Sequence, residues 1–226
     1  RHEVWLIDTD PDRADAIRTG GVTIQEKDGV RVFYPEARTE ASGVAPADLI
    51  LVFVKAMHTR RALEQNRRLI ADTAFVISLQ NGAGHEDILR EFVPVRRLVL
   101  GTTQHNASLQ APGRVRHGGG GMTHLGLLHP DDADLEPVAR AFRYCGIDTL
   151  VTADIRKRIW EKLFLNASAS ALTAVLQVPL GFIAEDPHAW TLATRLIREA
   201  VSVANAAGRD FDAGQVAADI RRVLLE

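Results

Sequence analysis

The 226-residue chain is poor in cysteine and in long apolar runs. Its one cysteine, Cys145, cannot form an internal disulfide, and no apolar stretch of about 18 residues and no signal-like start is present. A disulfide scaffold and a membrane-spanning helix are therefore not expected, and a reducing cytoplasm is the expected compartment. We expect Cys145 to be a core residue.

The chain also lacks a large excess of charge of one sign. Lysine and arginine number 27 against 29 aspartate and glutamate residues, which gives a formal net charge of −2. The arginines are scattered through the sequence rather than massed. Neither a nucleic acid nor an anionic membrane is therefore expected as a partner.

Two kinds of catalytic centre have no counterpart in the sequence. His105 and His124 do not belong to a His, Cys or carboxylate cluster with the spacing of known metal ligands, so no metal is expected. No Gly-x-Ser-x-Gly motif occurs, and Cys145 has no histidine close to it in sequence. Nucleophilic catalysis is therefore not supported.

The sequence does contain strand-like and helix-like segments in alternation. Apolar runs predict strands at 4–7, 49–54, 74–79, 98–102 and 148–151, and helical patterns lie at 11–20, 59–70, 85–92 and 135–144. Residues 22–34 predict a hairpin through Asp28-Gly29. The continuously apolar run at 49–54 predicts a strand covered on both faces. Alternation of this kind is typical of an α/β fold with a parallel sheet.

After residue 152 the pattern changes to long helices, at 155–175 and 188–207. A boundary near residue 152 therefore separates an α/β part from a helical part. The chain opens without methionine and stops within a helical pattern, so we expect it to be part of a longer polypeptide.

Lys162, Asn166 and Ser170 follow one another at steps of four residues within the first long helical pattern. On an α-helix of about 3.6 residues per turn, each step of four drifts by only about 40°, so an ammonium, an amide and a hydroxyl share one face. Such a face lines a ligand cleft in one interpretation and is simply solvated in the other.

Asp8 ends the strand-like run at 4–7. In a dinucleotide-binding fold, an acidic residue at such a strand end accepts hydrogen bonds from the adenosine ribose, and it repels a ribose phosphate, which favours NAD over NADP. The alternative is an ordinary aspartate that starts a turn. No Gly-x-Gly-x-x-Gly precedes Asp8, and Gly118–Gly121 lie between two strand-like runs, where no helix N-terminus could hold a phosphate.

Lys55 and the pair Asn81-Gly82 each follow a predicted strand. The carboxyl ends of parallel strands are where open α/β sheets bind ligands. A lysine, an amide side chain and a glycine that lets the backbone approach a ligand suit a cofactor or substrate contact. A lysine extended along the sheet edge and a plain turn are the alternatives.

The chain resembles the ketopantoate reductase family, that is, 2-dehydropantoate 2-reductases and their 2-oxo acid reductase relatives. The segments that carry the resemblance are Leu49–Lys55 (LILVFVK), Leu79–Gly84 (LQNGAG), Gly101–Gly126 (GTTQHNASLQAPGRVRHGGGGMTHLG) and Asp154–Thr173 (DIRKRIWEKLFLNASASALT). The resemblance spans nearly the whole chain. It implies a Rossmann-type dinucleotide-binding domain over residues 1–152, without its first strand and glycine loop, and a truncated helical domain for substrate binding and dimerisation over residues 153–226.

The resemblance also implies roles for single residues. Lys162 matches the family's catalytic lysine, which donates a proton to the keto oxygen as hydride from a nicotinamide reaches the carbonyl carbon. Asn166 matches a substrate-binding asparagine, and Lys55 and Asn81 match residues that line the cofactor and substrate cleft. Asp8 stands where NADP-using members carry a basic residue, so NAD is the preferred cofactor and NADP the other candidate.

Ser170 stands where the family commonly has a second asparagine, so a shorter donor contacts the substrate there. The substrate implied is therefore either ketopantoate or a related 2-oxo acid. A non-catalytic dinucleotide-binding protein of the same fold and an NAD-dependent dehydrogenase of a different 2-hydroxy acid are the alternatives. The family's glycine-rich loop would precede Arg1, and its serine and acidic substrate-binding residues would follow Glu226. A homodimer is expected, since helical domains of this family often pair.

Overall fold

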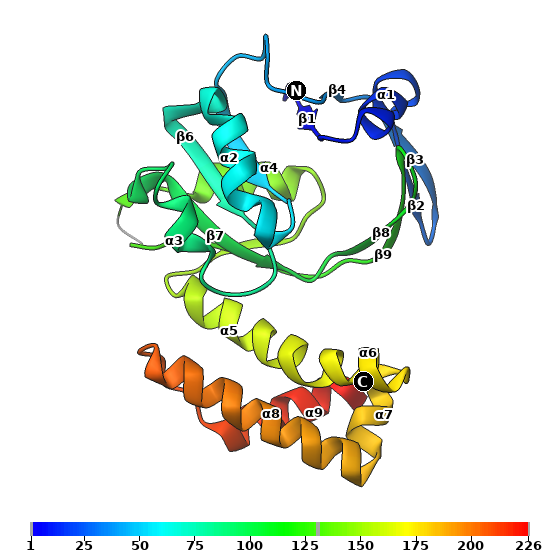
Figure 1. Cartoon of the computed structure of the whole chain (residues 1–226), viewed down its shortest axis with the longest axis vertical. Coiled ribbons are helices and arrows are strands. Elements are labelled where there is room, and N and C mark those ends of the chain that lie inside the picture. Colours follow the sequence, from blue (N-terminus) through cyan, green and yellow to red (C-terminus); the bar gives the residue numbers. More distant parts are fainter. Residues whose placement is uncertain (1, 130–131, 226) are drawn as a thin grey trace. The chain divides into compact units, whose positions relative to one another are not determined.

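The computed structural model describes residues 2–129 and 132–225 (Figure 1). Residues 1, 130, 131 and 226 lie outside the described part. The chain divides into two compact units, Arg1–Gln80 with Gly84–Ile155 and Asn81–Ala83 with Arg156–Glu226. The first unit carries the sheets and the second is built from helices, which confirms the predicted fold class.

The largest sheet of the first unit has five strands in the order β11-β10-β7-β6-β5. Its strands are β5 (Ala47–Val52), β6 (Ile70–Ser78), β7 (Leu98–Thr103), β10 (Thr123–Leu127) and β11 (Thr149–Val151). β5, β6 and β7 run parallel, whereas β10 is antiparallel to β7 and parallel to β11. The carboxyl ends of β5, β6 and β7 therefore lie along one edge of the sheet.

Short helices connect these strands. They are η1 (Ala56–His58), α2 (Thr59–Gln65), η2 (Arg67–Leu69), α3 (His85–Leu89), η3 (Val95–Arg97) and α4 (Glu136–Tyr144). The centre of the sheet is apolar, because Val76, Ile77, Leu98, Val99 and Leu125 are each fully buried. Continuous apolar runs in the sequence thus correspond to strands covered on both faces at β6 and β7.

A separate two-stranded parallel sheet joins β1 (Trp5–Ile7) to β4 (Glu36–Arg38), and α1 (Pro11–Gly20) follows β1. Asp10 caps this helix, since its side chain accepts the Arg13 N–H at 3.2 Å. Gly21 ends it with a φ of 73°, and a side chain there would lie 2.5 Å from the Phe33 carbonyl oxygen. The predicted strand and helix are both confirmed.

The remaining sheet has four strands in the order β3-β2-β9-β8, with β2 (Val22–Glu26), β3 (Gly29–Phe33), β8 (Asn106–Ala111) and β9 (Arg114–Gly119). The predicted hairpin is confirmed, because β2 and β3 pair antiparallel. β8 was not predicted: its residues, Asn-Ala-Ser-Leu-Gln-Ala, alternate in polarity, but all six are exposed and Leu109 is the one large apolar residue among them. Gly118 and Gly119 end β9, and β10 rather than a helix follows, as the sequence indicates.

Two burial predictions are wrong. β5 is an edge strand of the five-stranded sheet and ends at Val52, so Leu51 is 43% and Phe53 64% exposed instead of covered on both faces. Cys145 is exposed, because it follows the last turn of α4, whose buried residues are Val138, Ala139 and Phe142.

The second unit contains α5 (Ile155–Leu165), a π-helix (Asn166–Ser170), α6 (Ala171–Leu176), α7 (Leu180–Glu185), α8 (Pro187–Ala206) and α9 (Ala213–Leu225). Its core is a cluster of apolar side chains that includes Phe164, Ile183, Ala193 and Ile197. Asp186 caps α8 by accepting the N–H groups of His188 and Ala189. Within the described ranges, no helix is long and apolar enough to cross a membrane.

Candidate active site

Lys162 lies in the last turn of α5 in the helical unit. Its side chain is half-buried rather than exposed, and this burial lowers the pKa of the Lys162 ammonium. Desolvation disfavours the charged form of an amine, so the proton is held less tightly than on a lysine in water. An ammonium in this state is a suitable proton donor.

The prediction of an unbroken α-helix over 155–175 is wrong at one place. α5 ends at Leu165, residues Asn166–Ser170 form a π-helix, and α6 begins at Ala171. A π-helix closes i→i+5 hydrogen bonds, turns less per residue than an α-helix and occurs frequently at functional sites. A four-residue step overshoots one turn by about 40° in an α-helix and falls short of one turn in a π-helix. The step from Asn166 to Ser170 therefore offsets the drift from Lys162 to Asn166. The side chains of Lys162, Asn166 and Ser170 remain in one column along the helix, the polar column.

The polar column borders the core of the helical unit. Lys162, Asn166 and Ser170 are each half-buried, whereas Phe164 is 1% and Ser168 0% exposed. The Ser168 hydroxyl donates to the Phe164 carbonyl oxygen at 2.6 Å, a bond that satisfies this buried hydroxyl. The three side chains of the column thus lie at the rim of the core and not on a fully solvated face.

The loop after β6 contains two of the predicted contact residues, Asn81 and Gly82. By its contacts, the segment Asn81–Ala83 belongs to the helical unit, the unit that also holds Lys162. Gly82 has a φ of 105° and Gly84 a φ of 87°, the left-handed region that favours glycine. The backbone therefore turns at Gly82 and Gly84, and Asn81 belongs to the same unit as Lys162.

Gln80 is a functional candidate that sequence reasoning missed. Its Nε2 donates to the Val54 carbonyl oxygen at 2.5 Å and lies 2.8 Å from Thr59 Oγ1, and its Oε1 accepts the Ser78 hydroxyl at 3.0 Å. One amide thereby joins the chain just before Lys55 to the chain just before Asn81. The sequence signal is a glutamine directly after an apolar strand, which alone gives no reason to select it.

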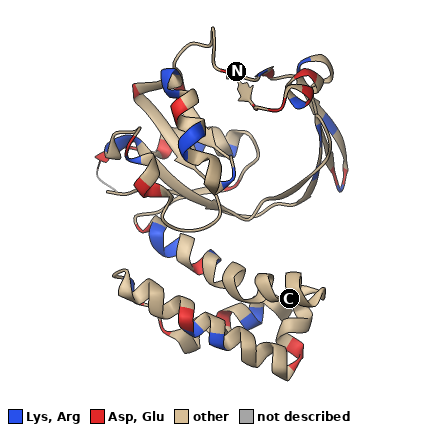
Figure 2. Cartoon of the chain, in the orientation of Figure 1, with Lys and Arg blue, Asp and Glu red and all other residues tan. Residues whose placement is uncertain are grey.

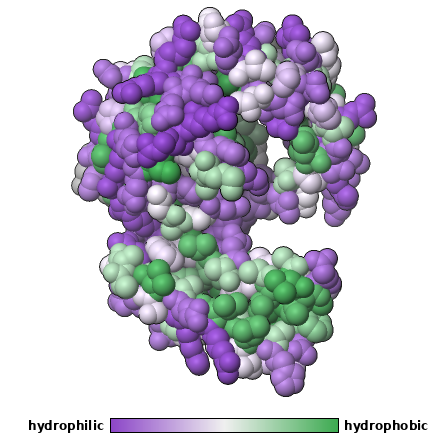
Figure 3. Space-filling view, viewed as in Figure 1, coloured by the Kyte–Doolittle hydropathy of each residue, from purple (hydrophilic) through white to green (hydrophobic). Residues whose placement is uncertain are grey.

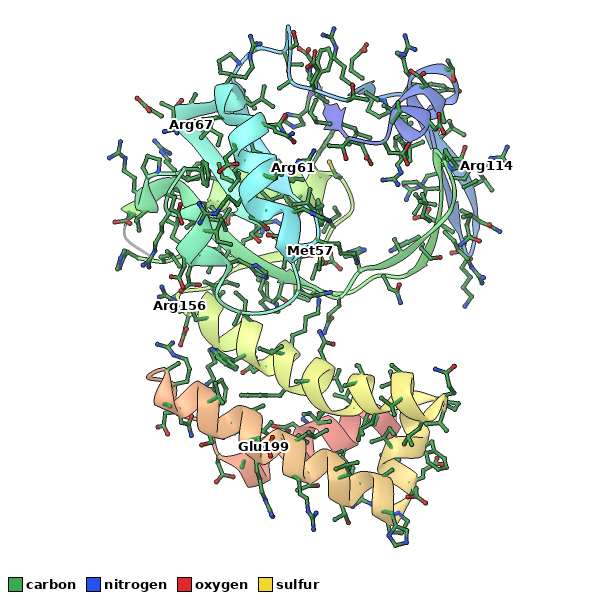
Figure 4. All side chains as sticks on the ribbon, viewed as in Figure 1. Met57, Arg61, Arg67, Arg114, Arg156 and Glu199 are labelled. Carbon is green, nitrogen blue, oxygen red and sulfur yellow. The ribbon has the colours of Figure 1, made fainter. Side chains whose placement is uncertain are left out.

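Lys55 follows β5 and is exposed. Its carbonyl oxygen accepts the His58 N–H at 2.8 Å, which starts the turn η1. Met57, labelled in Figure 4, lies in this turn and is 85% exposed. Lys55 and Asp8 belong to the first unit, so the structure does not group them with the polar column of the helical unit.

Asp8 lies at the carboxyl end of β1, where its N–H donates to the Arg38 carbonyl oxygen at 3.0 Å. One carboxylate oxygen accepts the Asp10 N–H at 3.0 Å. This bond forms a turn, as in the alternative interpretation of Asp8 as an aspartate that starts a turn. The other oxygen lies 2.5 Å from Arg13 Nη1. The Asp8 side chain is 29% exposed, so it starts a turn and is also reachable from solvent.

The structure pairs His105 with His117, whose rings are stacked. His105 Nδ1 lies 3.1 Å from His117 Nε2, and His117 Nδ1 lies 3.4 Å from Glu26 Oε1. Among residues 2–129 and 132–225, no group of three or more His, Cys, Asp or Glu side chains is arranged to hold a metal ion.

Two family models match the chain. The model described as "Ketopantoate reductase PanE/ApbA" matches residues 1–130, and the model described as "Ketopantoate reductase PanE/ApbA C terminal" matches residues 154–226. Together they cover most of both units.

The most similar curated relatives include proteins named 2-dehydropantoate 2-reductase. A 2-dehydropantoate 2-reductase from Halobacterium salinarum is 38% identical over 207 residues, which cover 91% of this chain and 68% of that protein. A 2-dehydropantoate 2-reductase from Archaeoglobus fulgidus is 33% identical over 78% of this chain and 58% of that protein.

Solved structures agree with these sequence matches. A D-mandelate dehydrogenase in ternary complex with NADH and anilino(oxo)acetate has a TM-score of 0.92 and 25% identity over 99% of this chain and 72% of that chain. A 2-dehydropantoate 2-reductase from Geobacter metallireducens has a TM-score of 0.89 and 28% identity over 99% of this chain and 75% of that chain. The chain therefore belongs to the ketopantoate reductase family.

Proposed function

We propose that this chain reduces the keto group of a 2-oxo acid to a 2-hydroxy acid, with a reduced nicotinamide cofactor as hydride donor. The observation that carries the proposal is Lys162, a half-buried ammonium with a lowered pKa in a chain of the ketopantoate reductase family. A protonated lysine beside the keto oxygen polarises the carbonyl and neutralises the alkoxide as it forms. Because burial lowers the pKa of Lys162, its proton is transferred more readily.

Asn166 and Ser170 position the substrate in this proposal. Both carry hydrogen-bonding groups, lie within two turns of Lys162 and are half-buried at the rim of the same core. Ser170 has a shorter side chain than asparagine, so it leaves more room for the substrate. Similarity to 2-dehydropantoate 2-reductases and to a D-mandelate dehydrogenase supports ketopantoate or a related 2-oxo acid as substrate.

Residues that follow three of the parallel strands, β1, β5 and β6, fit a nicotinamide dinucleotide. Asp8 presents a partly exposed carboxylate at the carboxyl end of a parallel strand, where ribose hydroxyls are bound in dinucleotide folds. Lys55 and Asn81-Gly82 follow β5 and β6. Gly82 has a left-handed φ, which favours glycine, and a glycine has no side chain to keep a ligand away from the backbone. When bound, the reduced nicotinamide supplies the hydride. We assign Asp8, Lys55, Asn81 and Gly82 to cofactor binding and prefer NAD because of Asp8.

The direct test is an absorbance assay of NADH and NADPH oxidation with ketopantoate and a panel of other 2-oxo acids. We expect turnover with at least one acid and a higher kcat/KM with NADH than with NADPH, because Asp8 repels a ribose phosphate. A clear preference for NADPH would overturn the assignment of NAD.

Absence of turnover with every acid, while NADH still binds, would favour a second function, a non-catalytic dinucleotide-binding protein. A strong preference for a 2-oxo acid other than ketopantoate would identify a dehydrogenase of a different 2-hydroxy acid. The same assay therefore separates these alternatives.

We further propose that the chain works in the cytoplasm as a homodimer. A single cysteine suits a reducing compartment. The helical unit leaves large apolar side chains of α6 and α7 exposed, which a second copy could cover. Cell fractionation tests the compartment, and the oligomeric state is tested as described in the Discussion.

A further inference from the structure

Arg13 forms an ionic link between the two acidic residues that enclose the start of α1. Its Nη1 lies 2.5 Å from Asp8 Oδ2 and its Nη2 lies 3.2 Å from Asp10 Oδ2. One guanidinium therefore contacts the carboxylate proposed to bind the ribose and the carboxylate that caps the helix. Figure 2 shows acidic and basic residues close together on α1.

The position of Asp8 does not depend on Arg13 alone. The Asp10 N–H donates to Asp8 Oδ1 at 3.0 Å, and the Asp8 N–H donates to the Arg38 carbonyl oxygen at 3.0 Å. Backbone groups thus hold both the side chain and the main chain of Asp8. Removal of the Arg13 side chain would leave these two bonds in place.

Arg13 is also the better placed of two nearby arginines to meet a ligand. Arg38 stacks on the Trp5 ring at 4.8 Å, and its Nη1 donates to the Ser42 carbonyl oxygen at 2.6 Å. The Arg13 side chain is 35% exposed, and each of its two Nη atoms, one beside Asp8 and one beside Asp10, carries a second N–H. Arg13 therefore has donors beyond those that face Asp8 and Asp10.

The charge balance at this strand end decides how a ribose phosphate is received. Such a phosphate adds a charge of about −1.5 to −2. Asp8 and Asp10 alone present two negative charges to it, whereas with Arg13 the three side chains carry a net single negative charge. A guanidinium also binds phosphate oxygens through paired N–H donors.

We infer that Arg13 is a specificity-determining residue that lets this site accept a 2′-phosphorylated nicotinamide dinucleotide beside the unphosphorylated one. This inference rests on the proposed function, because it takes Asp8 as the ribose-binding residue. Asp8 favours NADH through its acceptor oxygens, and Arg13 limits the repulsion that would otherwise exclude NADPH. An aspartate at this strand end without a neighbouring arginine would discriminate more strongly between NADH and NADPH.

The test measures dissociation constants of NADH and NADPH by fluorescence titration of the full chain, without substrate. We expect Arg13→Ala to weaken NADPH binding about tenfold or more and to change NADH binding by less than about twofold. Arg13→Lys, which keeps the charge but loses the paired donors, should lie between these values. The matched control is Arg18→Ala, because Arg18 lies on the same helix and pairs with Asp15 on its exposed face.

The effect should also shrink as salt is raised, since all three side chains are partly exposed. Equal losses of NADH and NADPH binding in Arg13→Ala, or an unchanged ratio in both Arg13 variants, would overturn the inference while leaving the proposed function standing. Failure of the unaltered chain to bind either dinucleotide would overturn both.

Discussion

At the scale of single residues, Lys162 combines two properties that oppose each other energetically. Its ammonium must be charged to donate a proton, yet burial disfavours the charge and lowers the pKa of Lys162. A half-buried position would be filled at a lower desolvation cost by an apolar side chain. A half-buried lysine is typical of a site where stability is given up for chemistry.

The lowered pKa predicts opposite pH dependences for the two directions of the reaction. Reduction needs the protonated amine, so kcat should fall as pH rises through the pKa of Lys162; oxidation of the 2-hydroxy acid needs the neutral amine, so kcat should rise through the same pKa. The midpoint should lie below the ordinary lysine value of about 10.4. Profiles of kcat against pH in both directions check this. If kcat changed in the same direction with pH for both reactions, or if the midpoint lay at the ordinary lysine pKa, the assignment of Lys162 as proton donor would be contradicted.

The same scale shows what a sequence can predict about a site. Lys162, Asn166 and Ser170 were selected from their spacing, because helical periodicity places steps of four on one face. Arg13 and Gln80 were not selected, since their relevance comes from contacts with Asp8, Val54 and Thr59 that no local pattern encodes. Asp8 and Arg13 are five residues apart, and Asp8 lies in a loop while Arg13 lies in a helix. Neither the strand nor the helix periodicity therefore predicts that their side chains meet.

At the scale of elements, strands and helices with a clear apolar period were predicted correctly. β6, β7 and α8 follow from continuous or amphipathic apolar patterns. β8 was missed because its six residues are all exposed and its alternation, Asn-Ala-Ser-Leu-Gln-Ala, contains one large apolar residue, Leu109. Its place in the sheet is fixed by pairing with β9, which a local pattern cannot show.

The π-helix at Asn166–Ser170 could not be predicted either. Its sequence, Asn-Ala-Ser-Ala-Ser, contains no proline or glycine that would mark a break in an α-helix. The change is a shift of backbone hydrogen bonds within one continuous helical stretch, and Phe164 and Leu172, on either side of the π-helix, lie in the same core. The element type was therefore predicted, while the local twist that aligns Ser170 with Lys162 was not.

At the scale of the whole molecule, the helical unit leaves an apolar surface uncovered. The residues of this apolar surface are Val175, Leu176, Leu180 and Phe182, which are 79%, 47%, 44% and 40% exposed. Figure 3 shows hydrophobic atoms gathered over α6 and α7. Exposed apolar groups of this kind are typical of a surface that binds another protein.

The homodimer proposal predicts that a charge on this apolar surface weakens self-association. Val175→Asp should raise the dimer dissociation constant about tenfold or more, because it buries an unpaired carboxylate in the interface. Met57→Asp in the first unit, at a residue that is 85% exposed, is the matched control and should leave the constant unchanged. Sedimentation equilibrium measures both. An unaltered chain that stays monomeric at every concentration would contradict the proposal.

The most direct measurement of the proposed chemistry is single-turnover hydride transfer to a 2-oxo acid in Lys162→Ala and Lys157→Ala. Both lysines lie on α5, but Lys157 is outside the polar column. We expect Lys162→Ala to slow the step by about a hundredfold or more while NADH binding changes by less than about twofold, and Lys157→Ala to react like the unaltered chain. Hydride transfer by Lys162→Ala within about threefold of the unaltered rate would contradict the role of Lys162 as proton donor.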